Sequence, residues 1–182
     1  LQKGAIEQIN NLIPDSFVSC LFTVPKSNGQ RRPVLNLKHL NQYVYNQTFK
    51  MESLRDIQTL LSQGNFLIKV DLTDAYMAVP MAKTSRCLLV FIFDRKIYQF
   101  KVMPFGLSSA PRIFTKLLKP LLSLLRSQGV LLIVYLDDIL LISSTADLCL
   151  IQGKLLIKLL IKLIQDLGFI VNMKKSVLIP TK

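Results

Sequence analysis

Two aliphatic runs of strand length flank a short polar step in the second half of the chain. The runs are residues 130–134 (VLLIV) and 139–142 (ILLI), and residues 135–138 (YLDD) stand between them. Runs of this length around a polar step predict a β-hairpin with Asp137 and Asp138 at its tip. Holding two adjacent negative charges among apolar residues is costly unless cations neutralise them, so a pair of divalent cations is the candidate ligand. The alternative is an ordinary tight turn, in which Asp is common.

The rest of the chain alternates between strand and helix patterns. It predicts helices at 3–12, 51–61, 111–126 and 150–167, and strands at 17–25, 31–37, 66–72, 88–93 and 97–102. The first two strands are joined through Asn28-Gly29, a strong hairpin signal. Lys154, Lys158 and Lys162 form a stripe at four-residue spacing. This stripe favours the solvent face of a packed helix over a helix lying on a membrane.

The distribution of charge changes this picture. The 182 residues fit one domain, or one domain with two lobes, and carry a net charge of +12. Such a charge favours a polyanionic partner, although Lys and Arg could also serve solubility alone. Four of only 11 acidic residues are Asp71, Asp74, Asp137 and Asp138. Acids concentrated in two short motifs of a basic protein indicate a metal site.

Hydropathy and cysteine usage bear on the origin of the chain. Hydrophobic residues make up 51% of the sequence, and the mean hydropathy of +0.39 fits either a membrane protein or a piece of a larger protein. No run reaches the roughly 18 uncharged apolar residues of a spanning helix, which favours the piece. The three widely spaced cysteines and the lone His39 argue against a zinc site. The three cysteines are expected to be buried thiols in a reducing compartment. Together with the absence of a visible signal peptide, this predicts an intracellular location.

The second acidic motif lies in residues 69–76 (KVDLTDAY). It places Asp71 at the end of a predicted buried strand, where the side chain can aim into a cleft. If neighbouring strands bring Asp71 close to Asp137 and Asp138, three carboxylates converge on two Mg²⁺ ions. That arrangement serves in-line phosphoryl or nucleotidyl transfer.

Five motifs, in this order and spacing, resemble the fingers and palm of a reverse transcriptase over nearly the whole chain. They are residues 32–41 (RPVLNLKHLN), 70–76 (VDLTDAY), 103–114 (MPFGLSSAPRIF), 135–138 (YLDD) and 167–176 (LGFIVNMKKS). The resemblance implies template-directed DNA synthesis from dNTPs with two Mg²⁺ ions, for which Mn²⁺ can substitute. Its overall character is similar to LTR-type retroelements of the DIRS group.

The resemblance also implies roles for individual residues. The metal ligands are Asp71 and Asp137, with Asp138 assisting and the carbonyl of Leu72 contributing. Lys175, or its neighbour Lys174, lies near the leaving pyrophosphate and donates a proton.

The implied nucleotide-binding residues are Lys26, Arg32, Asp74, Ala75, Tyr76, Phe105 and Gly106. Lys26 and Arg32 contact phosphates, and Asp74 lies near the triphosphate or sugar. Tyr76 packs under the sugar and excludes a 2′-hydroxyl. Gly106 permits close backbone approach to the nucleotide. Phe105 stands where retroviral enzymes carry glutamine, so no side-chain hydrogen bond is expected from it.

The resulting expectation is an α+β right-hand polymerase fragment with an antiparallel palm sheet backed by helices. Fingers are expected at about 1–46 and 79–109, and palm at about 47–78 and 110–182, with the thumb and RNase H regions of a parent polyprotein absent. Expected partners are an RNA or DNA template with primer, and no membrane. The rival interpretations are an RNA-dependent RNA polymerase, a non-catalytic nucleic-acid-binding remnant of a decayed retroelement, and a membrane-surface protein.

Overall fold

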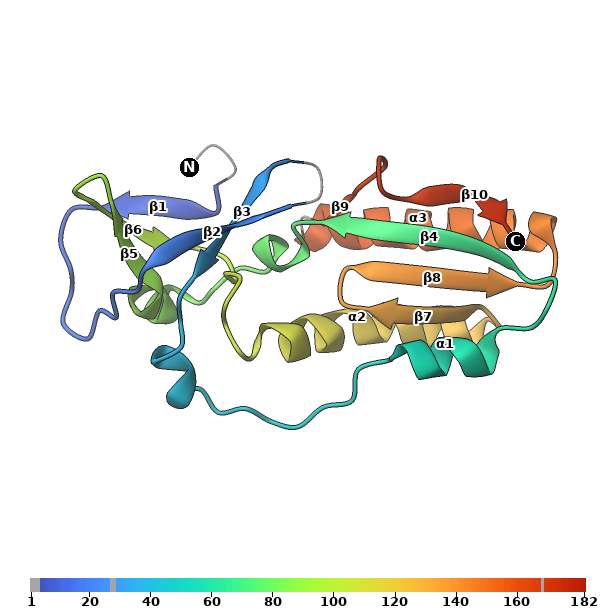
Figure 1. The fold of residues 1–182 in the computed structure, drawn as a ribbon, viewed down its shortest axis with the longest axis horizontal. Coiled ribbons are helices and arrows are strands. Elements are labelled where there is room, and N and C mark those ends of the chain that lie inside the picture. Colours follow the sequence, from blue (N-terminus) through green and yellow to red (C-terminus); the bar gives the residue numbers. More distant parts are fainter. Residues whose placement is uncertain (1–3, 27–28, 168) are drawn as a thin grey trace. The chain divides into compact units, whose positions relative to one another are not determined.

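The described residues fold as an α+β protein with three antiparallel sheets (Figure 1). The computed structural model describes residues 4–26, 29–167 and 169–182. The chain divides into two compact units. The first unit comprises Leu1–Gln47 and Tyr76–Pro111, and the second comprises Thr48–Ala75 and Arg112–Lys182.

The first unit is built from a three-stranded sheet and a hairpin. The sheet has the order β1 (Ile6–Ile9), β6 (Lys96–Phe100), β5 (Val90–Phe93), and the hairpin pairs β2 (Leu21–Pro25) with β3 (Arg31–Leu35). Short 3-10 helices lie at η1 (Leu40–Gln42), η2 (Ala75–Ala78) and η3 (Lys83–Leu89), η2 beginning at the last residue of the second unit. The ring of Phe91 lies 5.5 Å from Tyr98 and 5.6 Å from Phe100, and all three rings are buried.

The second unit contains the longer sheet. Its strand order is β10 (Val177–Thr181), β4 (Phe66–Thr73), β8 (Asp138–Ser143), β7 (Leu131–Tyr135), and β9 (Ile170–Val171) also pairs with the end of β4. All pairings are antiparallel, as expected for the palm sheet.

Three helices accompany this sheet. They are α1 (Leu54–Leu60), α2 (Ala110–Ser127) and α3 (Ala146–Leu167), and α3 packs along β4, β8 and β10 (Figure 1). A capping box of Ser53 and Asp56 begins α1, and the hydrogen bond from the Ser53 side chain lowers the pKa of Asp56. In α2 the buried side chains recur at helical spacing, at Phe114, Leu118, Leu121, Leu122 and Leu125.

Most predicted elements are present, but one predicted helix and one predicted burial are wrong. The helix predicted at 3–12 is wrong, because residues Ile6–Ile9 form β1 and pair with β6. The apolar spacing of this segment fits a helix turn as well as a strand, and pairing with a strand 90 residues away decides the outcome. Cys20 is exposed, contrary to the predicted burial of all three thiols. The Asn28 of the predicted turn lies outside the described residues.

Candidate functional site

The antiparallel pairing of β4 with β8 places two of the predicted carboxylates directly opposite each other. Asp71 and Asp138 are register partners at the end of the pairing. The side chain of Asp71 is buried, whereas that of Asp138 is 45% exposed. The pairing therefore brings together residues that are 67 positions apart in the sequence.

Asp137 lies in the turn of the predicted hairpin, which the structure confirms. Tyr135 pairs with Asp138, so Leu136 and Asp137 form a two-residue turn between β7 and β8. Leu136 has a φ of 54°, a left-handed conformation that favours glycine and stores strain here. The carbonyl of Asp137 accepts a hydrogen bond of 2.9 Å from the N–H of Leu72. The hairpin tip is thus tied to the end of β4, next to Asp71.

Two lysines supply positive charge to these carboxylates. Lys69 Nζ lies 2.9 Å from Asp138 Oδ1, and Lys175 Nζ lies 3.9 Å from Asp71 Oδ2. The hydrogen bond to Asp138 raises the pKa of Lys69, partial burial opposes that rise, and the negative charges of Asp138, Asp71 and Asp137 add to it. All three acidic residues therefore act electrostatically on one ammonium group. Of the two lysines that the resemblance left open, Lys175 is the one placed beside Asp71.

The donor chemistry of this group fits Mg²⁺ bound together with a nucleotide. In the described part of the chain, no three His, Cys, Asp or Glu side chains are grouped closely enough to hold a metal ion by themselves. Mg²⁺ in phosphoryl-transfer sites is held by one or two carboxylates plus substrate phosphates and waters. Asp71 and Asp138 supply such hard oxygen ligands, and both already lie against cationic groups. The ligand role of the Leu72 carbonyl stays a prediction.

Two residues missed by the sequence interpretation hold the backbone of Asp71. Ser176 Oγ accepts a hydrogen bond of 3.0 Å from the N–H of Asp71, and the N–H of Asn172 donates to the carbonyl of Asp71 at 2.8 Å. Both lie in the predicted lysine motif, where only Lys174 and Lys175 had been given a role. Their short polar side chains gave no signal of a partner 100 residues earlier.

In the first unit, the ring of Phe105 contacts two other predicted nucleotide-binding residues, Arg32 and Tyr76. The guanidinium carbon of Arg32 lies 4.5 Å from the ring centroid of Phe105, and the Phe105 ring lies 5.2 Å from that of Tyr76. Arg32 Nε is buried and has no hydrogen-bond partner among the described residues. The Phe105 ring therefore holds Arg32 through a cation–π contact on one side and contacts Tyr76 on another.

Gly106 makes a close backbone contact within the same unit. Its φ is 108°, and a Cβ atom added there would lie 2.1 Å from the carbonyl oxygen of Leu35. The observed close approach is therefore to Leu35, and the predicted approach to a nucleotide stays a prediction. Asn41, to which no role had been given, donates to the Gly106 carbonyl and accepts from the Ser108 N–H, both at 2.9 Å.

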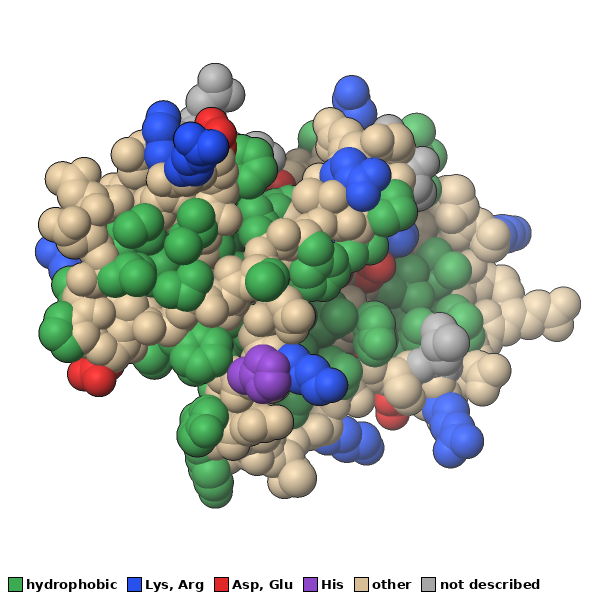
Figure 2. Space-filling view, turned by 60° about the vertical axis from the view of Figure 1, so that its left-hand side comes forward, with side chains coloured by type: hydrophobic (Ala, Val, Ile, Leu, Met, Phe, Trp, Pro, Cys, Tyr) green, Lys and Arg blue, Asp and Glu red, His purple; other side chains and the backbone are tan. Residues whose placement is uncertain are grey.

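The remaining predicted nucleotide-binding residues lie at turns. The N–H of Lys26 donates to the carbonyl of Gln30 at 2.7 Å, directly after β2. Asp74 follows β4 with a φ of 46°, and Ala75 is buried. Lys and Arg side chains are spread over the face seen in Figure 2, among few Asp and Glu side chains, as the net charge of +12 implies. Searched for membrane spans, the described helices yield none that is both long and apolar enough.

Comparison with known proteins supports the fold and the family that the sequence motifs predict. Residues 24–182 match the family model described as "Reverse transcriptase (RNA-dependent DNA polymerase)". The chain is 30% identical over 155 residues to the genome polyprotein of Petunia vein clearing virus, a match that covers 85% of this chain and 7% of that protein. It is 30% identical over 122 residues to the transposon Tf2-3 polyprotein of Schizosaccharomyces pombe, covering 67% of this chain and 9% of that protein.

Among solved structures, a foamy viral protease-reverse transcriptase in complex with double-stranded DNA is similar, with a TM-score of 0.79 and 24% identity. This match covers 98% of the present chain and 29% of the viral chain, and it shows the fingers–palm fold. The chain spans less than a tenth of the length of the two polyproteins. Because the family model covers most of its residues, the chain belongs to the reverse transcriptase family.

Proposed function

We propose that this chain carries out template-directed DNA synthesis from dNTPs as the fingers and palm of a retroelement polyprotein. The observation that carries the proposal is the register of β4 and β8, which sets Asp71 opposite Asp138 and beside the Asp137 turn. Family membership supports it. We further propose that the parent polyprotein is that of an LTR-type, DIRS-like element, and that it supplies the thumb and RNase H regions.

In this proposal the second unit performs the transfer step. Asp71 and Asp137, assisted by Asp138 and the Leu72 carbonyl, hold two Mg²⁺ ions, which Mn²⁺ can replace. When bound, the ions supply activation of the primer 3′-hydroxyl and stabilisation of the leaving pyrophosphate. The 3′-oxygen forms a bond to the α-phosphorus, the bond to pyrophosphate breaks, and the hydroxyl proton passes to solvent. Lys175 donates a proton to the pyrophosphate.

The first unit binds the nucleotide. Arg32, with its fixed planar guanidinium, and Lys26, as a point charge, contact the triphosphate. Tyr76 lies under the sugar and disfavours a 2′-hydroxyl, and Gly106 lines the same nucleotide. Asp74 and Ala75, which belong to the second unit, also bind the nucleotide. Phe105 acts through its ring, since it offers no hydrogen bond and already contacts Arg32 and Tyr76.

Primer extension on an RNA template tests the reaction. Asp137→Asn removes one negative charge from the metal ligands while keeping the shape of the turn residue. We expect dNTP incorporation to fall at least a thousandfold, because metal-dependent charge stabilisation contributes several kcal/mol to such transfers. Template–primer affinity, measured by fluorescence anisotropy, should change less than threefold.

Asp147→Asn provides the matched control, since Asp147 lies exposed in the first turn of α3. Equal turnover by Asp137→Asn and the parent would refute the assignment. If neither protein extends a primer, Mn²⁺ affinity in the presence of a dNTP, which supplies the phosphate ligands, gives a readout that needs no thumb. The parent should then bind Mn²⁺ at least tenfold more tightly than Asp137→Asn. Nucleic-acid binding without Mn²⁺ binding would instead point to the non-catalytic remnant.

Sugar selectivity separates a DNA polymerase from an RNA polymerase. Tyr76→Ala should raise the kcat/KM for ribonucleotides relative to deoxynucleotides at least tenfold, because the ring that excludes the 2′-hydroxyl is removed. Tyr43→Ala is the control, since Tyr43 lies in the same unit and is 83% exposed. Single-nucleotide incorporation with paired dNTP and rNTP titrations measures the ratio, and an unchanged ratio would argue against the role of Tyr76.

A further inference from the structure

Strand β7 leads into the Asp137 turn and lies at the outer edge of its sheet. Within the described sheet it pairs with β8 alone. In an antiparallel pair, alternate residues point their N–H and C=O groups away from the partner strand, and at an edge these groups have no strand to bind. Such an edge can fray, and in β7 fraying would begin three residues before Asp137.

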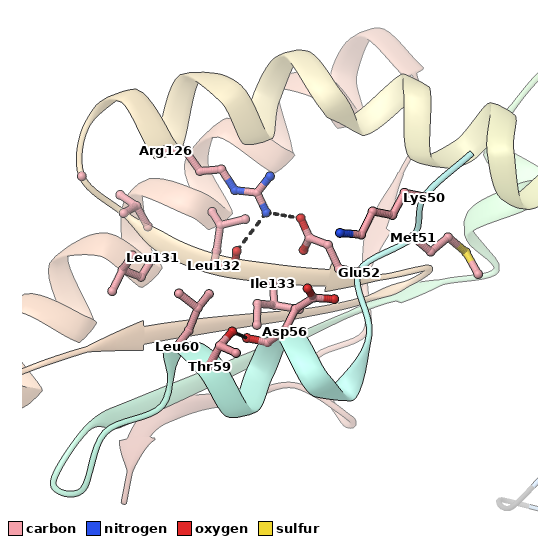
Figure 3. Close-up of a pocket in the computed structure, with 12 residues that line it drawn as sticks. Lys50, Met51, Glu52, Asp56, Thr59, Leu60, Arg126, Leu131, Leu132 and Ile133 are labelled. Carbon is pink, nitrogen blue, oxygen red and sulfur yellow. Dashed lines mark hydrogen bonds and ion pairs between the residues drawn. The ribbon is translucent and has the colours of Figure 1, made fainter. Parts of the chain in front are cut away.

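Two charged side chains bind this free edge. Glu52 Oε2 accepts a hydrogen bond of 2.6 Å from the N–H of Val134, and Arg126 Nη2 donates to the carbonyl of Leu132 at 3.0 Å. The same Arg126 Nη2 lies 2.5 Å from Glu52 Oε1. Figure 3 shows the two side chains meeting over the strand. One ion pair therefore binds two of the outward backbone groups that a neighbouring strand would bind, the Val134 N–H and the Leu132 carbonyl.

The pair connects three elements of the second unit. Glu52 directly precedes Ser53, the N-cap of α1, and Arg126 lies in the last turn of α2, where the helix dipole favours a cation. Both side chains border a cavity of about 590 Å³ between α1, the end of α2 and β7 (Figure 3). Glu52 is 31% and Arg126 43% exposed, so the contacts are partly shielded from water.

We propose that Glu52 and Arg126 are positioning residues for the metal-binding turn at Asp137. The turn contains Leu136 in a left-handed conformation, so it is strained and depends on its supports. On one side the Asp137 carbonyl accepts from Leu72 N–H, and on the other the Glu52–Arg126 pair fixes Val134 and Leu132. The inference rests on the proposed function only in assigning metal binding to the turn, because the contacts of Glu52 and Arg126 with β7 are observed directly.

Amide hydrogen exchange and Mn²⁺ affinity in the presence of a dNTP, both measured on the whole chain, test the proposal together. Glu52→Ala should speed exchange of the Tyr135 and Asp138 amides at least tenfold and weaken Mn²⁺ binding at least threefold. Glu52→Gln keeps an oxygen acceptor for Val134 N–H and should show a smaller change in both. Arg126→Met should resemble Glu52→Ala, and adding it to Glu52→Ala should bring little further change, because the pair acts as a unit.

Glu7→Ala is the matched control. Glu7 forms a comparable, partly exposed ion pair with Arg86 in the first unit, so its loss should leave both readouts unchanged. Parent-like exchange and Mn²⁺ affinity in a folded Glu52→Ala protein would overturn the proposal, as would faster exchange with unchanged affinity. If Glu52→Ala does not fold, Glu52→Gln and Arg126→Met decide by the same readouts. A parent that binds no Mn²⁺ would refute the proposed function. The exchange data would still test whether Glu52 and Arg126 stabilise the β7–β8 turn.

Discussion

At the scale of single residues, the candidate metal ligands are carboxylates that already lie against ammonium groups. Lys69 contacts Asp138 and Lys175 contacts Asp71. A cation bound by these carboxylates would compete with the two lysines, so the affinity for a cation depends on how strongly the lysines bind the carboxylates. Lys69 could not be singled out from the sequence, because its role depends on the register that brings Asp138 beside it.

The raised pKa of Lys69 gives a prediction about stability at alkaline pH. Because the folded-state pKa exceeds the ordinary value of 10.5, the contribution of Lys69 is fully present below that pH and is lost as the pH rises through the folded pKa. The side chain is 44% exposed, so screening limits the contribution to about 0.2–1 kcal/mol. Urea unfolding of the parent and Lys69→Met from pH 8 to 12 measures it.

The difference in free energy of unfolding between parent and Lys69→Met should shrink above pH 10.5. Lys154→Met is the control, because Lys154 lies exposed on α3, outside this group. A difference that stays constant across the whole pH range would contradict the electrostatic role of Lys69.

At the scale of elements, two strands, β10 and β9, pair with successive parts of the same edge of β4. The gap between these two pairings lies at Asp71. β10 pairs with Lys69 and Leu67, β9 pairs with Leu72 and Thr73, and the residues between have no strand partner on that side. Ser176 Oγ and the Asn172 N–H fill the gap by binding the Asp71 backbone. A side chain and a turn thus replace a strand at the position of Asp71, a candidate metal ligand.

Ser176→Ala removes the acceptor for the Asp71 N–H. Leaving that partly buried donor unpaired should lower the free energy of unfolding by about 1–2 kcal/mol and speed exchange of the Asp71 amide. Ser127→Ala, at the exposed end of α2, should cost less than about 0.5 kcal/mol. Urea unfolding and hydrogen exchange measure both, and equal effects of the two substitutions would argue against a special role for Ser176.

Elements with strong local patterns were predictable, whereas those fixed by distant partners were not. The 130–142 hairpin and the 111–126 helix follow from apolar runs and periodicity, and both are confirmed. The sequence predicts a helix at the position of β1, because the apolar spacing there is ambiguous without β6. Site residues within motifs could be named by resemblance. The contacts of Glu52 and Arg126 could not, since no local pattern links residues 74 positions apart.

At the scale of the whole molecule, neither unit is a continuous stretch of chain. The backbone leaves one unit for the other after Gln47, Ala75 and Pro111. The second unit therefore takes its central strand β4, with Asp71, from a segment that precedes most of its other elements by more than 35 residues. The sheet can form only after this long-range pairing is made, so the placement of Asp71 opposite Asp138 depends on it.

Residues 112–182 expressed alone should therefore remain unfolded. They contain β7, β8, β9, β10, the whole of α3 and most of α2, yet in the described sheet β9 and β10 pair with β4, which the segment lacks. Without β4, the β8 edge of the β7–β8 hairpin has no strand partner and α3 loses its contacts with β4, and a two-stranded hairpin is at best marginal in water. Circular dichroism with urea titration should show no cooperative transition for 112–182, beside a cooperative one for the intact chain. Cooperative unfolding of the isolated segment would mean that the β7–β8 hairpin is stabilised locally, and that β4 joins a preformed structure.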